Sequence, residues 1–256
     1  MSTPTVEFRD VRLAFGEKEI LSGVNLVVPE RARLVILGQS GSGKSTLLRL
    51  ILGILKPTSG GVFFVGSDLT RRDRRGLNQM RQKMGMVYQY SALISSLSVR
   101  DNLALPLEEL TRKTRAEIDA LVDEKLTLVG KADARDKMPA ELSGGMRKRV
   151  GLARGIIMDP QLILYDEPSA GLDPVISSVI NELMISLSEK IGATSIIVTH
   201  EMESAFKTAT HMAMLFQGTI IAAGTPEEFK SSEHPVVAQF ISGDTKGPIL
   251  EATSKP

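Results

Sequence analysis

Short apolar runs alternate along the chain with longer segments in which apolar residues recur at helical spacing. Such an order of strands and helices is typical of an α/β protein, in which helices cover a largely parallel sheet. The runs that we predict as buried strands are 34–37, 84–88, 162–165, 194–198 and 212–216. We therefore expect an α/β fold with a mixed or parallel sheet at its core.

Two regions depart from this alternation. Residues 5–14 and 20–28 have the pattern of paired strands on either side of a short turn, which predicts a small N-terminal antiparallel β lobe. The segment 101–134 is rich in Leu, Glu, Lys and Arg at helical spacing and contains no strong strand pattern. We expect it to form part of a helical subdomain over about 92–158.

The last part of the chain collects Gly, Pro, Ser and Lys from Ser231 onward. We expect one folded domain over 1–243, followed by an extension over 244–256 that is either mobile or docked on a partner. The apolar residues Phe240 and Ile241 stand before this extension as anchors.

Composition limits the classes of function. Lys and Arg number 31 against 30 Asp and Glu, for a net charge of +1, so no overall field favours nucleic acid as a partner. Cysteine is absent, which excludes disulfides, thiol nucleophiles and Cys-based metal centres. No apolar run reaches the roughly 18 residues of a membrane-spanning helix, and no secretory signal pattern precedes the first strand. We expect a cytoplasmic protein.

The clearest chemical motif lies at 38–45, where Gly-Gln-Ser-Gly-Ser-Gly-Lys-Ser fits the pattern G-x-x-x-x-G-K-[ST]. A strand precedes it and a helical pattern follows it, as a phosphate-binding loop requires. Backbone N–H groups of such a loop surround phosphate oxygens, while Lys44 adds positive charge and Ser45 ligates Mg²⁺. The predicted binding residues are Gly38, Gln39, Ser40, Gly41, Ser42, Gly43, Lys44, Ser45 and Thr46.

Two carboxylates, Asp166 and Glu167, follow the apolar strand 162–165. The carboxyl end of such a strand faces the ligand crevice. Because successive side chains of a strand point in opposite directions, we expect the two acids to have different roles. Asp166 is predicted to hold the Mg²⁺ shell, and Glu167 is the candidate base for a water in line with the γ-phosphorus. His200 ends another strand and is a candidate to reach the reacting phosphate, the alternative being a hydrogen-bonded structural histidine.

A second glycine pair lies in Leu-Ser-Gly-Gly-Met at 142–146, ahead of a helical segment. Ser143 with the amides of Gly144 and Gly145 forms either a second phosphate site or an ordinary helix cap. Taken alone, the residue pattern favours the cap, because the chain has only one lysine-bearing phosphate loop.

In their order along the chain, these motifs resemble the nucleotide-binding domain of ATP-binding cassette (ABC) proteins. The resemblance covers about residues 5–230 and includes Gln89 after an apolar strand and the segment 169–173 after the acidic pair. It implies an ABC-type P-loop ATPase fold, with ATP and Mg²⁺ as cofactors. It also implies that Glu167 and His200 are catalytic.

The resemblance further implies individual roles. Phe15 would stack on adenine, and Gln89 would sense Mg²⁺ and couple to a permease. Asp173 would lie in a loop that crosses a dimer. Ser143 and the two glycines after it would cap ATP held by the other subunit of a head-to-tail homodimer, which favours the phosphate site over the simple cap. The implied metal ligands are Ser45, Gln89 and Asp166.

Three local patterns resemble the ATPases that serve MCE-type (mammalian cell entry) lipid transporters, namely 142–146, 88–93 and 239–249. This resemblance implies phospholipid transport between inner and outer membrane, with the ATPase at the cytoplasmic face of the inner membrane. An integral-membrane permease and an MCE-domain lipid-binding protein would be its partners, and the tail would dock on the opposite ATPase. A small regulatory subunit, the lipid and the direction of transport stay open.

Other functions are compatible with part of the pattern. The ATPase of a small-solute ABC importer would share the motifs but gives no reason for the C-terminal tail. A soluble cassette acting on DNA or ribosomes usually carries two cassettes or a long coiled coil, and this chain shows neither pattern. A P-loop kinase would not account for Gln89 or for the glycine pair after Ser143.

Overall fold

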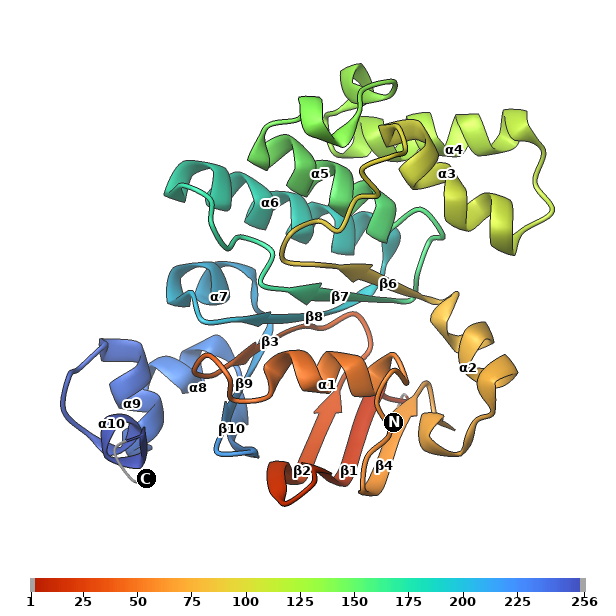
Figure 1. Cartoon of the computed structure of the whole chain (residues 1–256). Coiled ribbons are helices and arrows are strands. Elements are labelled where there is room, and N and C mark those ends of the chain that lie inside the picture. Colours follow the sequence, from red (N-terminus) through yellow and green to blue (C-terminus); the bar gives the residue numbers. More distant parts are fainter. Residues whose placement is uncertain (1–2, 254–256) are drawn as a thin grey trace.

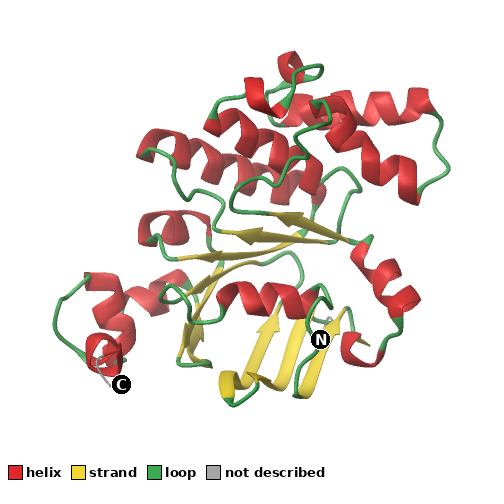
Figure 2. Ribbon diagram, viewed as in Figure 1, coloured by secondary structure: helices red, strands yellow, loops and turns green. Residues whose placement is uncertain are grey.

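The computed structural model describes residues 3–253. The molecule is built from two sheets and a layer of helices. Helix α1 (Lys44–Ile51) lies between the two sheets (Figure 1). Helices lie on both faces of the larger sheet, in the middle of the view, and the strands of the smaller sheet lie below it (Figure 2). The α/β fold expected from the alternation is confirmed.

The N-terminal lobe is an antiparallel sheet with the strand order β2-β1-β4-β5. Strands β1 (Val6–Phe15) and β2 (Lys18–Val28) form the predicted hairpin, with Val6 opposite Val28 and Phe15 opposite Lys18. The sequence pattern missed β4 (Ser59–Phe64) and β5 (Ser67–Asp68). β4 pairs with β1 from some 50 residues away in the chain, and such pairing leaves no local signal.

The central sheet has the order β10-β9-β3-β8-β7-β6. Its neighbours pair in parallel from β9 to β6, and only β10 runs antiparallel to its neighbour β9. The strands are β3 (Arg33–Leu37), β6 (Met84–Val87), β7 (Leu162–Asp166), β8 (Thr194–Thr199), β9 (His211–Phe216) and β10 (Thr219–Gly224). The mixed sheet predicted from the apolar runs is present.

Alternating residues of β3 divide between two cores. Leu34 and Ile36 pack into a cluster shared with α1 and the antiparallel lobe, whereas Val35 and Leu37 pack under the helices of the opposite face. A central parallel strand is buried on both faces in this way, which explains its continuous apolar sequence. The strand ends are thereby fixed, and with them the loops that follow.

The helices after α1 surround the central sheet. They are α2 (Arg74–Arg81), α3 (Val99–Leu110), α4 (Arg115–Leu128), α5 (Gly144–Gly155), α6 (Pro174–Ile191), α7 (Met202–Thr208), α8 (Pro226–Lys230), α9 (Pro235–Ser242) and α10 (Pro248–Thr253), with 3-10 turns at Leu69–Arg71, Ala132–Ala134 and Pro139–Glu141. None of the helices described within residues 3–253 has the length and apolar character to cross a membrane.

Helices α3, α4 and α5 lie inside the predicted helical subdomain, while the boundaries 92–158 stay a prediction. Arg100 of α3 ties the subdomain together. Its guanidinium contacts Asp119 of α4 at 2.8 Å and Glu108 at 3.1 Å. Asp119 also accepts a 2.7 Å contact from Arg135, so one carboxylate joins two arginines from separate elements.

The C-terminal extension folds back on α9. Gln239 accepts a hydrogen bond from the backbone N–H of Ile249 at 2.8 Å and donates one to the carbonyl of Asp244 at 3.0 Å. Ile249 is buried and packs in the core that α9 shares. Docking of this segment on a partner stays a prediction, and its last residues, 254–256, lie outside the described part of the chain.

Candidate nucleotide-binding and catalytic site

The glycine loop connects β3 to α1 and has a backbone that only glycine satisfies at two positions. A Cβ on Gly38 would stand 2.4 Å from the carbonyl oxygen of Leu215. Gly43 has a φ of 103° and is the N-cap of α1, a conformation that side chains strongly disfavour. The loop can therefore curl tightly at the end of the central strand.

Lys44 lies at the start of α1 and is 6% exposed. Its ammonium donates to the carbonyl oxygens of Gly38 at 2.7 Å and Gln39 at 2.9 Å, and it stands 4.0 Å from a carboxylate oxygen of Glu167. Burial lowers the pKa of Lys44, and the nearby charges of Glu167 and Asp166 oppose that shift. The loop thus fixes a buried cation where an anion can meet it.

The N-terminus of α1 is itself suited to an anion. No side chain caps it within the described chain, and its first turn contains no acidic residue. Its free N–H groups and the positive end of the helix dipole therefore favour phosphate. Ser42 Oγ is buried without a hydrogen-bond partner among the described residues, which leaves a further polar atom of the loop unused.

Ser45 connects the loop to the acidic strand end, because its hydroxyl donates to Asp166 Oδ1 at 2.8 Å. A hydroxyl and a carboxylate are hard oxygen donors of the kind that Mg²⁺ takes together with phosphate oxygens. No group of three or more His, Asp or Glu side chains within residues 3–253 could hold a metal alone. The pair therefore fits a metal that arrives with a nucleotide.

Glu167 is directed by its backbone rather than by strand alternation. Strand β7 ends at Asp166, and Glu167 has a φ of 47° while its N–H donates to the carbonyl of Val198. A left-handed residue turns the chain at this point, and Asp166 and Glu167 line the same cleft; their different roles stay a prediction. Glu167 Oε1 lies 3.0 Å from Nδ1 of His200.

These groups line one cleft of about 350 Å³. Its walls are Phe15, Ile20, Ser40, Gly41, Gly43, Lys44, Ser45, Thr46, Gln89, Asp166, Glu167 and His200. Phe15 is 55% exposed, so the face of its ring is available as a stacking surface at the cleft. The sequence motifs did not predict Ile20 as a site residue. Ile20 lies on β2, where its side chain stands next to Gly43 of the glycine loop.

The second glycine motif does not line this cleft. Ser143 is the N-cap of α5 and its hydroxyl accepts from the N–H of Met146 at 3.3 Å, while Gly144 and Gly145 begin the helix. A Cβ on Gly144 would meet nothing within 4 Å, so its surface is open. Asp173 likewise caps α6 by accepting from the N–H groups of Val175 and Ile176. Within one chain these residues act as helix caps.

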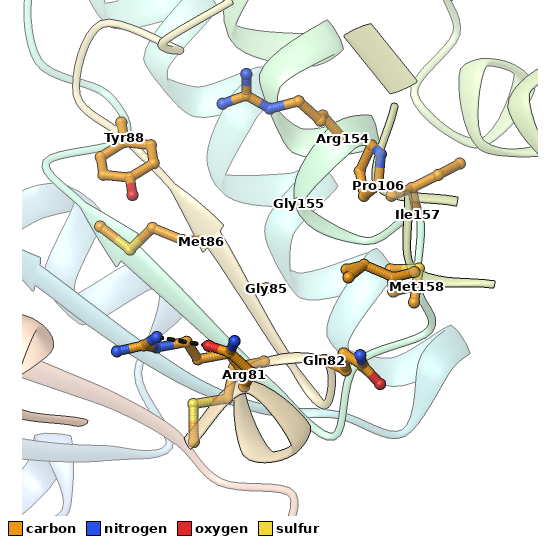
Figure 3. Close-up of a pocket in the computed structure, with 13 residues that line it drawn as sticks. Arg81, Gln82, Gly85, Met86, Tyr88, Pro106, Arg154, Gly155, Ile157 and Met158 are labelled. Carbon is orange, nitrogen blue, oxygen red and sulfur yellow. Dashed lines mark hydrogen bonds between the residues drawn. The ribbon is translucent and has the colours of Figure 1, made fainter. Parts of the chain in front are cut away.

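A separate, more apolar groove of about 430 Å³ lies beside β6. Met86 and Tyr88 line it from β6 and the residue just after it, Pro106 from α3, and Arg154 and Met158 from α5 and its end (Figure 3). Because Gln89 directly follows Tyr88 and lines the nucleotide cleft, the same short stretch of chain borders both cavities.

Comparison with known proteins agrees with this geometry. The ABC transporter family model matches residues 21–170, and the chain belongs to that family. It is 40% identical over 245 residues to the probable ribonucleotide transport ATP-binding protein mkl of Mycobacterium tuberculosis, covering 96% of this chain and 68% of that protein. It is 39% identical over 249 residues to the intermembrane phospholipid transport system ATP-binding protein MlaF of Haemophilus influenzae, covering 97% and 94%.

Among solved structures, the dimeric post-hydrolysis state of the ATP-binding cassette MJ0796, bound to ADP and Pi, superposes with a TM-score of 0.79. The two sequences are 31% identical, and the match covers 86% of this chain and 98% of that one. The fold is thus the ABC cassette. The chain is an ATP-hydrolysing subunit of an ABC transporter, similar to the ATPases named mkl and MlaF.

Proposed function

We propose that the cleft holds Mg-ATP with its phosphates on the glycine loop. The buried ammonium of Lys44 and the uncapped N-terminus of α1 support this position, because both favour the β and γ phosphates. Ser45, Asp166 and Gln89 would complete the Mg²⁺ shell, which neutralises phosphate charge. Phe15, exposed at the rim of the cleft, would stack on the adenine.

Hydrolysis then needs a group that takes a proton from the attacking water. Glu167 is that group in our proposal, because its carboxylate lines the cleft and its Oε1 lies 3.0 Å from Nδ1 of His200. The carboxylate is therefore oriented beside the glycine loop, where it can take a proton from water. His200 would position the carboxylate and contact the γ-phosphate.

The cleft is open on one side, and we infer that a second copy of the chain closes it. Ser143, Gly144 and Gly145 present an exposed helix N-terminus that would face the γ-phosphate of the partner in a head-to-tail homodimer. Asp173 would lie in the loop that crosses between the copies. The dimeric form of the matched cassette MJ0796 supports this arrangement.

For the cargo, we propose phospholipid transport between inner and outer membrane through an MCE-type complex. The support is the 39% identity over nearly the full length of MlaF, whose name assigns it to intermembrane phospholipid transport. The chain would act at the cytoplasmic face of the inner membrane. An integral-membrane permease would occupy the groove at Tyr88 and Arg154, an MCE-domain protein would carry the lipid, and a small regulatory subunit is a further candidate partner.

One observation favours a second candidate. The relative named mkl is called a probable ribonucleotide transport ATPase and is equally similar to this chain, which supports the ATPase of a small-solute importer. The two candidates differ in the transported substrate that should stimulate ATP hydrolysis. The chain, purified with its permease through a tag in detergent micelles, should hydrolyse ATP faster when phospholipid is supplied. Stimulation by ribonucleosides alone would favour the importer instead.

A further inference from the structure

Two cationic side chains of α5 hold the loop that follows β6. Lys148 donates its ammonium to the carbonyl oxygen of Gln89. One turn or more further along the helix, Arg154 donates to the carbonyl of Ala92 at 2.6 Å and to that of Ser91 at 2.9 Å. Three carbonyls of a four-residue stretch are therefore bound by a single helix.

The backbone of this loop is strained at two neighbouring residues. Ser91 and Ala92 have φ values of 61° and 47°, and left-handed backbone costs about 1 kcal/mol or more for a residue with a side chain. The loop also packs directly on α5, where a Cβ on Gly151 would stand 3.1 Å from Cβ of Ser91. Glycine at position 151 lets α5 approach the loop closely enough for Lys148 and Arg154 to reach its carbonyl oxygens.

Burying the charged ammonium of Lys148 costs desolvation free energy, which a merely structural contact does not require. Lys148 is 7% exposed, and burial lowers its pKa although the carboxylates Glu201 and Glu167 oppose the shift. A buried cation is retained where its charge and donors are used. Two of the groups that it faces, Glu167 and Gln89, line the nucleotide cleft.

We propose that Lys148 and Arg154 are positioning residues for ATP hydrolysis, which clamp the loop 89–92 to α5 and thereby set where the Gln89 side chain stands in the cleft. Arg154 also lines the apolar groove, where it lies on α5 opposite Tyr88 (Figure 3). A shift of α5 would move the loop backbone, and the loop would move Gln89. The effect on turnover rests on the proposed Mg²⁺ role of Gln89.

The experiment uses a single fluorophore on the loop. The chain contains no tryptophan, and Tyr90 is 84% exposed, so Tyr90→Trp gives one reporter beside the clamped carbonyls. In this background Lys148→Met and Arg154→Met are each compared with Arg149→Met, the matched control. Arg149 is on the same helix but donates to Val129, away from the cleft.

Loss of either clamp should lower the fluorescence anisotropy of the introduced tryptophan and reduce kcat by about ten-fold or more, with the KM for ATP changed less than about two-fold. Arg149→Met should change neither quantity, and Lys148→Arg should restore part of the anisotropy. Melting temperature identifies a variant that fails to fold, and Arg154→Met then provides the independent test.

Unchanged anisotropy in folded Lys148→Met and Arg154→Met would overturn the clamp. Lower anisotropy with parental kcat would overturn its catalytic role. Gln89→Ala separates this proposal from the one it rests on. If Gln89→Ala keeps the parental kcat, the assigned role of Gln89 is wrong, and the positioning role fails with it. If Gln89→Ala lowers kcat but Lys148→Met and Arg154→Met do not, only the clamp is rejected.

Discussion

The imidazole Nδ1 of His200 lies 3.0 Å from Oε1 of Glu167, and among the described residues the other carboxylate oxygen has no hydrogen-bond partner. The contact joins the ends of two adjacent parallel strands, since β7 pairs with β8. An oriented carboxylate beside the glycine loop is the arrangement that a general base requires. The proposed catalytic and phosphate-binding residues therefore line one cleft.

Lys44→Ala should abolish productive ATP binding without unfolding the chain. The ammonium is the main side-chain positive charge of the loop, and alanine leaves Gly38 and Gln39 carbonyls that repel phosphate. Binding of a fluorescent ATP analogue and the melting temperature measure the two effects. ATP hydrolysis at the parental rate would remove Lys44 from the site.

Ser143 and Lys44 should act in one composite site contributed by two subunits. A mixed dimer with Ser143→Arg in one copy and Lys44→Ala in the other would carry both lesions at a single nucleotide and leave the second site intact. We expect about half of the ATP-binding capacity to remain, since one site of two is spared. Loss of activity at both sites while one still holds ATP would show that the sites are not independent.

Removal of the chain from Gly243 onward should leave ATP affinity unchanged, because α10 packs on α9 and none of its residues lines the cleft. We expect weaker assembly with the permease or slower lipid transfer, because the deleted segment is the candidate docking element. Purification of the truncated chain with its permease measures the first effect. Undiminished complex stability together with undiminished lipid transfer would reject the docking role.

The stability that Arg100 provides should depend on pH. Its hydrogen bond and charge lower the pKa of Asp119. The pKa of Asp101 is lowered first by the hydrogen bond from Ser98 and then by the hydrogen bond and charge of Arg100. A carboxyl whose pKa is lower in the folded chain stabilises the fold above its ordinary pKa of about 3.9, and that contribution is lost as the pH falls through the folded value. The Tm difference between the parent and Arg100→Met should be largest near neutral pH.

Below about pH 4 the same Tm difference should shrink, because the carboxylates become protonated first in the unfolded chain and then, at lower pH, in the folded chain. Arg115→Met is the matched control, since Arg115 is 86% exposed and 4.0 Å from Asp119. Its Tm difference should be small at every pH. A Tm difference for Arg100→Met that stays constant from pH 7 to 3 would contradict this account.

The sequence predicts what local pattern determines. The succession of strand, glycine loop and helix identifies Lys44 and Ser45, and the end of an apolar strand identifies Asp166. In each case the residue directly follows or ends a predicted strand, so its position at the carboxyl edge of the sheet can be read from the sequence. The pairing of Glu167 with His200 depends on two strands that are 33 positions apart. Their adjacency follows from the strand order, which no local pattern encodes.

Other features escape prediction for a different reason. The acceptors for Lys148 and Arg154 are backbone carbonyls, which every residue carries and which leave no trace in residue type. The left-handed φ of Glu167 is equally silent, because glutamate rarely adopts it. The strand β4 is missed because it pairs with β1, from which β2, β3, the glycine loop and α1 separate it in the sequence.

The most direct test is the effect of Mg-ATP on the oligomeric state and turnover of Glu167→Gln. The amide cannot take the proton of water, so hydrolysis should slow by about 10² to 10⁴ while ATP still binds. ATP held between two subunits should then accumulate, and light scattering should find a dimer with Mg-ATP and a smaller species without nucleotide. Parental turnover, or a chain no more dimeric with Mg-ATP than without it, would contradict the account.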